Sequence, residues 1–381
     1  MLARQAAVGG GFGPLNFLTS GFIAGFRIRI LRRLALSGYD RTCPVRVGMP
    51  ESPRSENSMT EPLPPLRLAA APISWGVCEV PDWGAVLDPD TVLGEMRALG
   101  FRATELGPPG YLPDPPRALL DRYGLTAVGG FAALPLSRGP QAVRAAADQV
   151  CRSLAGAEVL VLGAGTGAEG YDGRARSGGD HRAAQKYAGR GGQRPDDQAE
   201  CVGQAVDWSA LVDAAGAVRD LAAGYGLRTV LHPHVGTHIE SAESIERFLA
   251  DSDLDLCLDT GHVLAGGGDP LSLVRRYPQR IGHVHLKDVR AEYAAKIRSG
   301  GWNYADAVGQ GLYVPLGCGD VDIAAIVRAL RAAGYRGWYV LEQDTRLAAG
   351  DGPDGPRADV AASLQYLEDI AAHGDREAVA G

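Results

Sequence analysis

Histidine and carboxylate side chains are concentrated at a few places in this sequence, and their types could hold a metal ion. Six of the eight histidines lie between residues 232 and 285, and Asp259 lies among them. Glu105 and Glu342 occupy similar places before and after this region. Imidazole nitrogens and carboxylate oxygens together are a usual ligand shell for Mn, Fe, Co or Zn. These residue types therefore predict a divalent-metal site, provided that the fold brings them together.

Each of these residues also has an ordinary structural explanation. A single histidine at the end of a strand is usually a hydrogen-bonding group of the structure. An aspartate after an apolar strand is often the N-cap of the next helix, as Asp259 could be. The metal prediction therefore depends on convergence, because several such side chains must end at one edge of one sheet.

Short apolar runs precede most of these polar residues and are predicted to be strands. Apolar residues at helical spacing lie between the runs, and glycines follow many of the helical stretches. Eight strand–helix units in order predict a parallel α/β fold and favour a closed (β/α)8 TIM barrel over an open doubly wound sheet. No glycine-rich fingerprint follows the first strand, which argues against a dinucleotide fold. The predicted strands cover residues 67–73, 101–106, 125–129, 158–163, 228–232, 254–259, 281–286 and 337–342.

In such a barrel the catalytic groups project from the carboxyl ends of the strands. Alternation along a strand sends residues i and i+2 to the same side. His232 and His234 should therefore share one side of the fifth strand, and His283 and His285 one side of the seventh. The barrel domain is expected to cover residues 65–375.

Two stretches lack the periodicity of the barrel. Residues 1–64 are rich in Gly, Pro, Ser and Arg, and we expect a disordered extension that lies upstream of a native start at Met59, or else a genuine flexible tail. Residues 164–204 are rich in Gly, Arg, Asp and Gln, and are expected to form a flexible insertion on the catalytic face. This insertion is either tolerated or serves as a lid.

The overall composition excludes several classes of protein. The formal charge of −7 and the pI of about 5.7 do not fit a nucleic-acid-binding domain. No run of about 18 uncharged apolar residues could span a membrane. The six cysteines form no CxxC pair and are expected to be incidental thiols, which predicts a cytoplasmic protein.

Several motifs resemble the xylose isomerase-like barrel superfamily of sugar isomerases, epimerases and dehydratases, and within it the inosose dehydratases. The resemblance covers most of residues 66–372 and includes Glu105-Leu106-Gly107 after the second strand. Its most specific segment is the run from His283 to Arg290. The other motifs are Ala71-Pro72-Ile73-Ser74-Trp75, His232-Pro233-His234-Val235-Gly236-Thr237, Leu258-Asp259-Thr260-Gly261-His262, Val314-Pro315-Leu316-Gly317-Cys318-Gly319-Asp320 and Glu342-Gln343-Asp344.

The resemblance implies a particular set of metal ligands. The superfamily usually takes Glu, Asp, His and Glu from strands five to eight, which places Asp259, His285 and Glu342 in the shell. Histidine stands where the fifth strand usually has Glu, so either His232 or His234 would be the remaining ligand. The implied metal is Mn²⁺ or Co²⁺, with Mg²⁺, Fe²⁺ and Zn²⁺ as alternatives.

The implied activity is that of a metal-dependent carbon–oxygen lyase that dehydrates 2-keto-myo-inositol (inosose), or a similar cyclic polyol ketone, in inositol catabolism. The alternative is a sugar (phosphate) isomerase or epimerase that moves a proton on a keto sugar with metal assistance. A barrel without catalytic function and a metal-dependent endonuclease are disfavoured, because the ligands are present and the chain is acidic.

Roles for individual residues follow from this hypothesis. Acid, base and electrostatic work could fall to any of four residues, and three more could hold the substrate. Two of these have simpler explanations, since Arg290 could pair with Asp288 and Trp75 could pack in the core. The partner is a small polyol or sugar, with no nucleic acid and no membrane. Because relatives often pair, the resemblance also suggests a homodimer. The catalytic candidates are His262, Lys287, Asp288 and Glu105, and the substrate-binding candidates are Trp75, His238 and Arg290.

Overall fold

The computed structural model describes residues 65–167 and 206–380 of the chain, with side chains to residue 372. The predicted extension over residues 1–64, with its start at Met59, lies outside the described residues. So does the predicted insertion beyond residue 167. The statements below concern the described residues alone.

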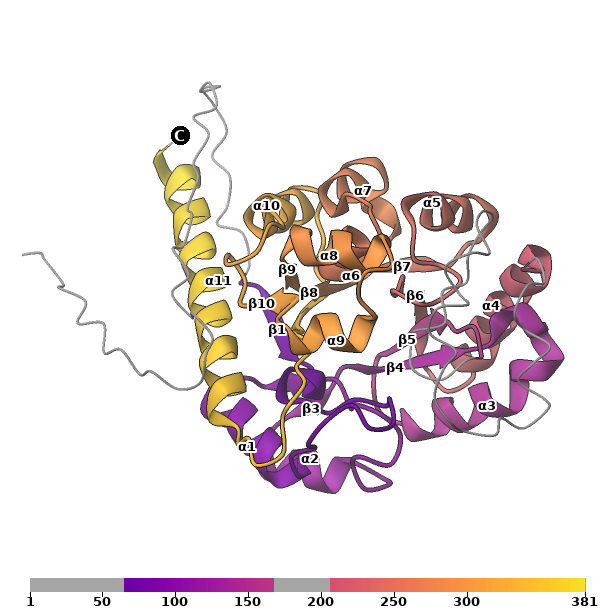
Figure 1. The fold of residues 1–381 in the computed structure, drawn as a ribbon, viewed down its shortest axis with the longest axis horizontal. Coiled ribbons are helices and arrows are strands. Elements are labelled where there is room, and N and C mark those ends of the chain that lie inside the picture. Colours follow the sequence, from indigo (N-terminus) through magenta and orange to yellow (C-terminus); the bar gives the residue numbers. More distant parts are fainter. Residues whose placement is uncertain (1–64, 168–205, 381) are drawn as a thin grey trace, which may run out of the picture. The chain divides into compact units, whose positions relative to one another are not determined.

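A parallel sheet forms the centre of the fold, with helices around it (Figure 1). Its strands are neighbours in the order β3-β2-β1-β11-β8-β7-β6-β5-β4. Successive strands are buried because helices cover the outer face, as is usual for parallel sheets. The strands are β1 (Arg67–Ala70), β2 (Ala103–Thr104), β3 (Thr126–Ala127), β4 (Gly129–Leu134), β5 (Val159–Ala164), β6 (Arg228–Leu231), β7 (Asp255–Asp259), β8 (Ile281–Leu286) and β11 (Trp338–Leu341).

The two end strands of this sheet are successive pieces of one extended segment. Only Val128 separates β3 from β4, and its N–H donates to the carbonyl of Thr104 in β2 at 2.9 Å. Its own carbonyl accepts from the N–H of Val159 in β5 at 3.0 Å. The segment therefore joins β2 on one side and β5 on the other, which makes a barrel of eight strands.

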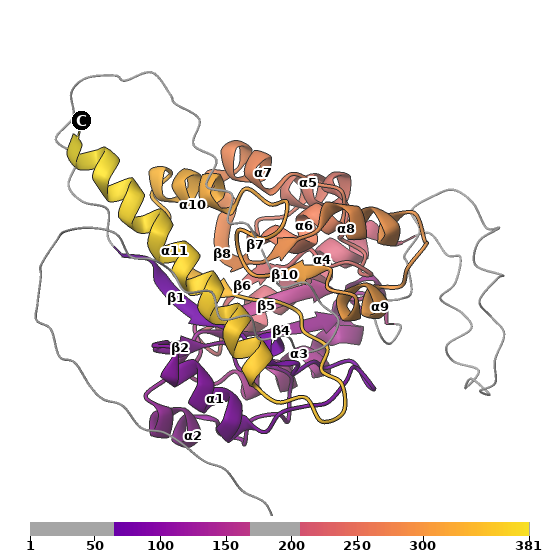
Figure 2. The same cartoon turned by 60° about the vertical axis from the view of Figure 1, so that its left-hand side comes forward.

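The helices begin and end where sequence signals place them. α10 buries Ile323, Ile326, Val327 and Leu330, which are spaced for one face of a helix, and the Asp322 carboxylate caps its first turn. Figures 1 and 2 show α10 and α7 side by side outside the barrel, with α11 running past α10. The helices are α1 (Pro89–Ala98), α2 (Arg117–Tyr123), α3 (Pro140–Ser153), α4 (Trp208–Ala223), α5 (Ala242–Asp251), α6 (Thr260–Ala265), α7 (Pro270–Arg276), α8 (Ala291–Arg298), α9 (Tyr304–Gly309), α10 (Ile323–Ala332) and α11 (Asp354–Ala380).

All eight predicted strand ranges contain a strand of the barrel, so the predicted fold class is confirmed. The third strand is longer than expected, because it continues through Gly129 and Gly130 to Leu134. These glycines do not end the strand but permit close packing, since a Cβ on Gly129 would lie 2.5 Å from the carbonyl oxygen of Val159. A small antiparallel pair, β9 (Asp288–Val289) and β10 (Tyr313–Val314), adds to one end of the barrel.

The cysteines differ in some respects from the expectation of incidental thiols. Cys78, Cys151 and Cys257 are free, whereas Cys318 is bonded in a disulfide.

In residues 65–167 and 206–380, no helix combines the length and the hydrophobicity needed to cross a bilayer.

Gly266 controls how closely α6 approaches the segment after β6, which carries His234. A Cβ at Gly266 would lie 1.8 Å from the backbone carbonyl oxygen of Glu240. We therefore expect Gly266→Ala to lower the free energy of unfolding by about 3 kcal/mol, because backbone must move to relieve the overlap. Gly216→Ala is the control, since a Cβ at this position inside α4 would meet no atom within 4 Å apart from the neighbouring backbone of the helix itself.

The control should raise the free energy of unfolding by up to about 1 kcal/mol through helix propensity. Urea denaturation followed by circular dichroism measures both variants. Equal stability of Gly266→Ala and Gly216→Ala would contradict the close contact described here.

Candidate active site

Four side chains that can bind metal meet at the carboxyl ends of four neighbouring strands. His232 follows β6, Asp259 ends β7, His285 lies in β8 and Glu342 follows β11. One ligand atom of each lies within 4.8 Å of the other three. The Glu342 side chain is 14% exposed and the other three are almost fully buried. We refer to these residues as the four-donor cluster.

The distances between the donors of the four-donor cluster are better explained by a shared cation than by hydrogen bonds from one donor to another. His285 Nδ1 and Glu342 Oε2 touch, yet among the described residues neither atom makes a hydrogen bond. Asp259 Oδ2 lies 3.3 Å from His232 Nε2 and 3.6 Å from His285 Nδ1. Buried polar atoms without a hydrogen bond are rare, so donors that converge in this way fit a bound cation.

Asp259 belongs to this cluster and also caps a helix. Its Oδ1 accepts the backbone N–H of His262 at 2.7 Å, in the first turn of α6. Its Oδ2 faces the histidines of the cluster and the Lys287 ammonium. The N-cap explanation and the ligand explanation, which the sequence presents as alternatives, therefore use different oxygens of one carboxylate.

Glu105, directly after β2, lies between two histidines of β8. Its Oε1 is 2.9 Å from His283 Nε2 and 3.0 Å from His285 Nε2, so both rings can donate to one oxygen. Burial alone would raise the pKa of Glu105, but His285 and His283 lower that pKa well below its usual range. A proton held on Nε2 of His285 leaves Nδ1 to face the cluster, as carboxylates commonly arrange for metal-binding histidines.

Lys287 brings a buried positive charge to the edge of the four-donor cluster. Its Nζ lies 2.6 Å from Asp344 Oδ1, 3.3 Å from Asp259 Oδ2 and 3.5 Å from Glu342 Oε1. Burial would lower the pKa of Lys287, but Asp259, Asp344 and Glu342 raise it well above its usual value. The side chain therefore stays an ammonium at neutral pH.

A second group of donors contains the other histidine of the fifth barrel strand. His234, His262 and Asp344 also have ligand atoms within 4.8 Å of one another. The rings of His234 and His262 are 3.8 Å apart between centroids. Burial, together with neighbouring positive charges, lowers the pKa of His234 to about 3 and that of His262 well below its usual value. Both imidazoles are therefore neutral at pH 7.

Three further residues belong to the site that were not predicted from the sequence, namely Asp344, Tyr304 and Tyr313. The Tyr304 hydroxyl donates a short hydrogen bond to Asp344 Oδ2 and lies 3.1 Å from the Tyr313 hydroxyl. Asp344 follows Glu342 by two positions, and alternation along the strand could have identified it. Tyr304 comes from α9, and no local signal in the sequence points to its position.

An open pocket gives access to both groups of donors. Its walls are mixed, with apolar residues from the loops after β1 and β2 facing the polar strand ends. This composition suits a small polar ligand with a carbon skeleton. Its lining includes Ile73, Val77, Cys78, Trp83, Glu105, Pro108, Phe131, His232, His234, His285, Tyr304, Glu342 and Asp344.

Seven predicted site residues are absent from this lining. Asp259, His262 and Lys287 belong to the donor groups or contact them, whereas the other four have different partners. Trp75 is fully buried in the core. The Asp288 carboxylate accepts four backbone N–H groups, those of Val289, Gly317, Gly319 and Val321. Burial raises the pKa of Asp288 to about 6, and these N–H groups oppose the rise. Arg290 donates to the carbonyl of Gly311 at 2.8 Å, and His238 lies 3.1 Å from the hydroxyl of Ser137.

The sequence of this chain is similar to a family model and to several curated proteins. The model of the xylose isomerase-like TIM barrel family matches residues 93–370. An inosose dehydratase of Geobacillus thermodenitrificans is 31% identical over 294 residues, which are 74% of this chain and 92% of the relative. The rhizopine catabolism protein MocC of Rhizobium meliloti is 31% identical over 73% of this chain and 82% of its own length.

Solved structures share the fold at lower identity. The IOLI protein with a bound zinc atom superimposes with a TM-score of 0.54 at 12% identity, over 81% of this chain and 99% of that chain. An L-ribulose 3-epimerase gives 0.53 at 18% identity, over 82% of this chain and 97% of its own. These likenesses establish the barrel architecture alone.

The neutral imidazoles of His234 and His262 should make the stability of the metal-free protein depend on pH. The unfolded chain, with histidine pKa values of about 6.5, binds protons that the folded protein does not. The stabilisation is fully present above pH 6.5 and is lost as the pH falls below it, by up to about 2.7 kcal/mol per pH unit for two groups. Urea denaturation in a chelator, between about pH 7 and about pH 5, measures this slope.

The double variant His234→Gln/His262→Gln provides the comparison. His238 and His283, whose pKa values are also lowered, contribute to the slope in both proteins. We expect a shallower slope in the double variant, and an unchanged slope would show that the two imidazoles bind protons in the folded protein as they do in the unfolded chain.

Proposed function

This chain belongs to the xylose isomerase-like TIM barrel family, and we propose that it is a metal-dependent carbon–oxygen lyase acting on 2-keto-myo-inositol or a similar cyclic polyol ketone. It is a dehydratase of the inosose dehydratase kind, as relatives at 31–32% identity support. The metal, the substrate and the roles of individual residues are our proposals. A cytoplasmic location and a homodimer remain predictions from the sequence.

The convergence of His232, Asp259, His285 and Glu342 is the observation that carries the proposal. Two imidazoles and two carboxylates suit Mn²⁺ or Co²⁺, and Mg²⁺, Fe²⁺ and Zn²⁺ are alternatives for the same donors. We assign the metal position from the fifth strand to His232, because His234 groups with His262 and Asp344 instead. A divalent ion held there would polarise the substrate carbonyl and make the adjacent C–H more acidic.

The residues around the cluster suit the proton movements of a dehydration. The reaction removes a proton from the carbon beside the ketone and releases the β-hydroxyl as water. His234 lines the pocket, and its Nδ1–H donates to the carbonyl of Val235 at 2.7 Å, so Nε2 is the acceptor nitrogen of this neutral ring. We propose His234 as the base.

Asp344 is proposed to protonate the departing hydroxyl. Burial and the nearby Glu342 raise its pKa, against the opposing effect of Lys287, and it lines the same pocket. The Lys287 ammonium, 2.6 Å from Asp344, holds this carboxyl in place and favours negative charge on a substrate oxygen. Glu105 accepts a hydrogen bond from Nε2 of His285 and so orients the ring with Nδ1 toward the metal position.

Substitution of the cluster carboxylates tests the metal site directly. Asp259→Asn and Glu342→Gln should each weaken Mn²⁺ binding about 100-fold or more, because each removes a negatively charged donor. The Asp259→Asn side chain can still cap α6, so the barrel should remain folded. Asp322→Asn, at the N-cap of α10, is the control and should bind Mn²⁺ as the wild type does.

Isothermal titration calorimetry gives the affinities and circular dichroism checks the fold. If Asp259→Asn and Glu342→Gln both bind Mn²⁺ like the wild type, this cluster is not the metal site.

The reaction itself is tested with purified enzyme, 2-keto-myo-inositol and Mn²⁺ or Co²⁺. Loss of water should give a diketone, seen as rising ultraviolet absorbance. Asp322→Asn should retain this activity and Glu342→Gln should lose it. Recovery of unchanged inosose would contradict the proposed substrate, and formation of a stereoisomer would favour the isomerase or epimerase alternative.

A further inference from the structure

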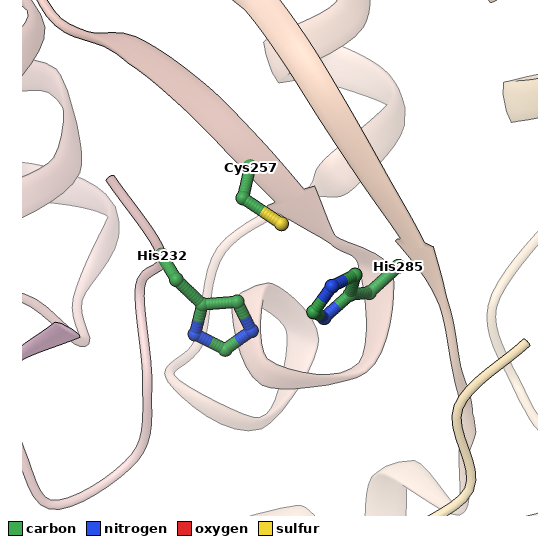
Figure 3. Close-up of side chains that lie close together, drawn as sticks. All are labelled: His232, Cys257 and His285. Atoms are coloured by element: carbon green, nitrogen blue, oxygen red, sulfur yellow. The ribbon is translucent and has the colours of Figure 1, made fainter. Parts of the chain in front are cut away.

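A buried thiol lies beside the two histidines of the four-donor cluster, and the proposed reaction makes no use of it. Figure 3 shows Cys257 with its sulfur directed toward the space between His232 and His285. Ligand atoms of these three residues lie within 4.8 Å of one another. The three come from adjacent strands, or from directly after one, because β6, β7 and β8 are neighbours in the sheet.

The position of Cys257 follows from the strand register. Cys257 precedes Asp259 by two residues in β7, so both side chains leave the same side of the strand. Cys257 pairs with His283 of β8, whereas Asp259 pairs with His285. The sulfur therefore lies one layer deeper in the barrel than the carboxylate of the four-donor cluster.

We propose that His232, Cys257 and His285 form a second cation site, specific for thiophilic ions such as Cd²⁺ and Zn²⁺. One thiolate and two imidazoles are a soft donor set, whereas the four-donor cluster offers two carboxylates to harder ions. The proposal goes beyond the dehydratase reaction, because it assigns a binding site for which that reaction has no need.

The surroundings of Cys257 keep its sulfur away from water, so a bound ion would have to displace the thiol proton. The thiol is fully buried and packs against the valines Val159, Val161 and Val230. Figure 3 shows Nε2 of His232 on the side of its ring that faces Cys257 and His285. Zn–S and Zn–N bonds place tetrahedral donors about 3.5 Å apart, so no two donors of the triad need to approach by more than about 1.3 Å to close on an ion.

The two cation sites exclude each other. Both require His232 and His285, so an ion bound to the thiol withdraws these imidazoles from Asp259 and Glu342. A thiophilic ion bound at Cys257 would therefore prevent the four-donor cluster from binding its own ion. Excess Mn²⁺ should compete with Cd²⁺ for the protein, and Cd²⁺ should compete with Mn²⁺.

Cadmium alone, titrated into the metal-free full chain, is the probe. A Cd–thiolate bond produces an ultraviolet charge-transfer band, which we expect on addition of the first equivalent of Cd²⁺. Cys257→Ser should remove this band and weaken Cd²⁺ binding about tenfold or more. Cys257→Ala should do the same, and it avoids burying a hydroxyl among valines. Circular dichroism confirms that both variants fold.

Matched variants identify the thiol. Cys78→Ser removes the free thiol that lines the pocket, and Cys151→Ser removes a buried thiol in α3. Both should keep the band at the first equivalent. Persistence of the band in Cys257→Ser and Cys257→Ala, or its loss in Cys78→Ser, would overturn the proposal.

Asp259→Asn separates this inference from the proposed function. It should lose affinity for Mn²⁺ while it retains the Cd–thiolate band, because Asp259 belongs only to the four-donor cluster. Loss of the band in a folded Asp259→Asn protein would show that the two sites are one and would also overturn the proposal. None of these measurements depends on turnover, so a negative test of inosose dehydration leaves their outcome intact.

Discussion

Buried negative charge is the constraint on which the rest of the site depends. The pKa values of Asp259, Glu342 and Glu105 are lowered, although burial opposes this, so all three carboxylates are ionised inside the barrel. Lys287 supplies one positive charge, and His285, whose pKa is raised, supplies a second. Among these five groups one negative charge stays uncompensated, with Asp344 left out of the count as the proposed acid, and buried uncompensated charge is costly. A divalent ion that replaces the proton on His285 would make the charges equal, which is an electrostatic reason for a metal here.

The carboxylates around the site also stabilise the backbone that positions them. Asp259 starts α6 with one oxygen and faces the cluster with the other, so the entry into that helix and the site share a single carboxylate. Asp288, the residue directly after Lys287, directs its carboxylate to backbone N–H groups. Its four N–H donors fix the turn at residues 317–321 and leave Lys287 as the charged group that meets the cluster.

The sequence predicts the strands and the ends at which the polar residues gather, because apolar runs and alternation are local properties of the chain. It could not distinguish His232 from His234, because both are expected on the same side of one strand. The difference arises from neighbouring strands, which place Asp259 and His285 beside His232. Asp288 matched a catalytic motif by type, but its partners come from a distant turn. Tyr304 was missed for the same reason, because only the tertiary fold brings α9 to Asp344.

The three polar side chains within and directly after β8 explain how a barrel core can hold such a site. His283, His285 and Lys287 alternate with apolar residues and so stack in successive layers on one side of the strand. Glu105 joins the two lower layers by accepting from both imidazoles, and Asp259 joins the two upper ones by facing His285 and Lys287. Each carboxylate thus bridges two layers, and each layer gains a partner of opposite charge or a hydrogen bond. A polar column of this kind can persist among fully buried strands because each of its layers contacts a buried carboxylate.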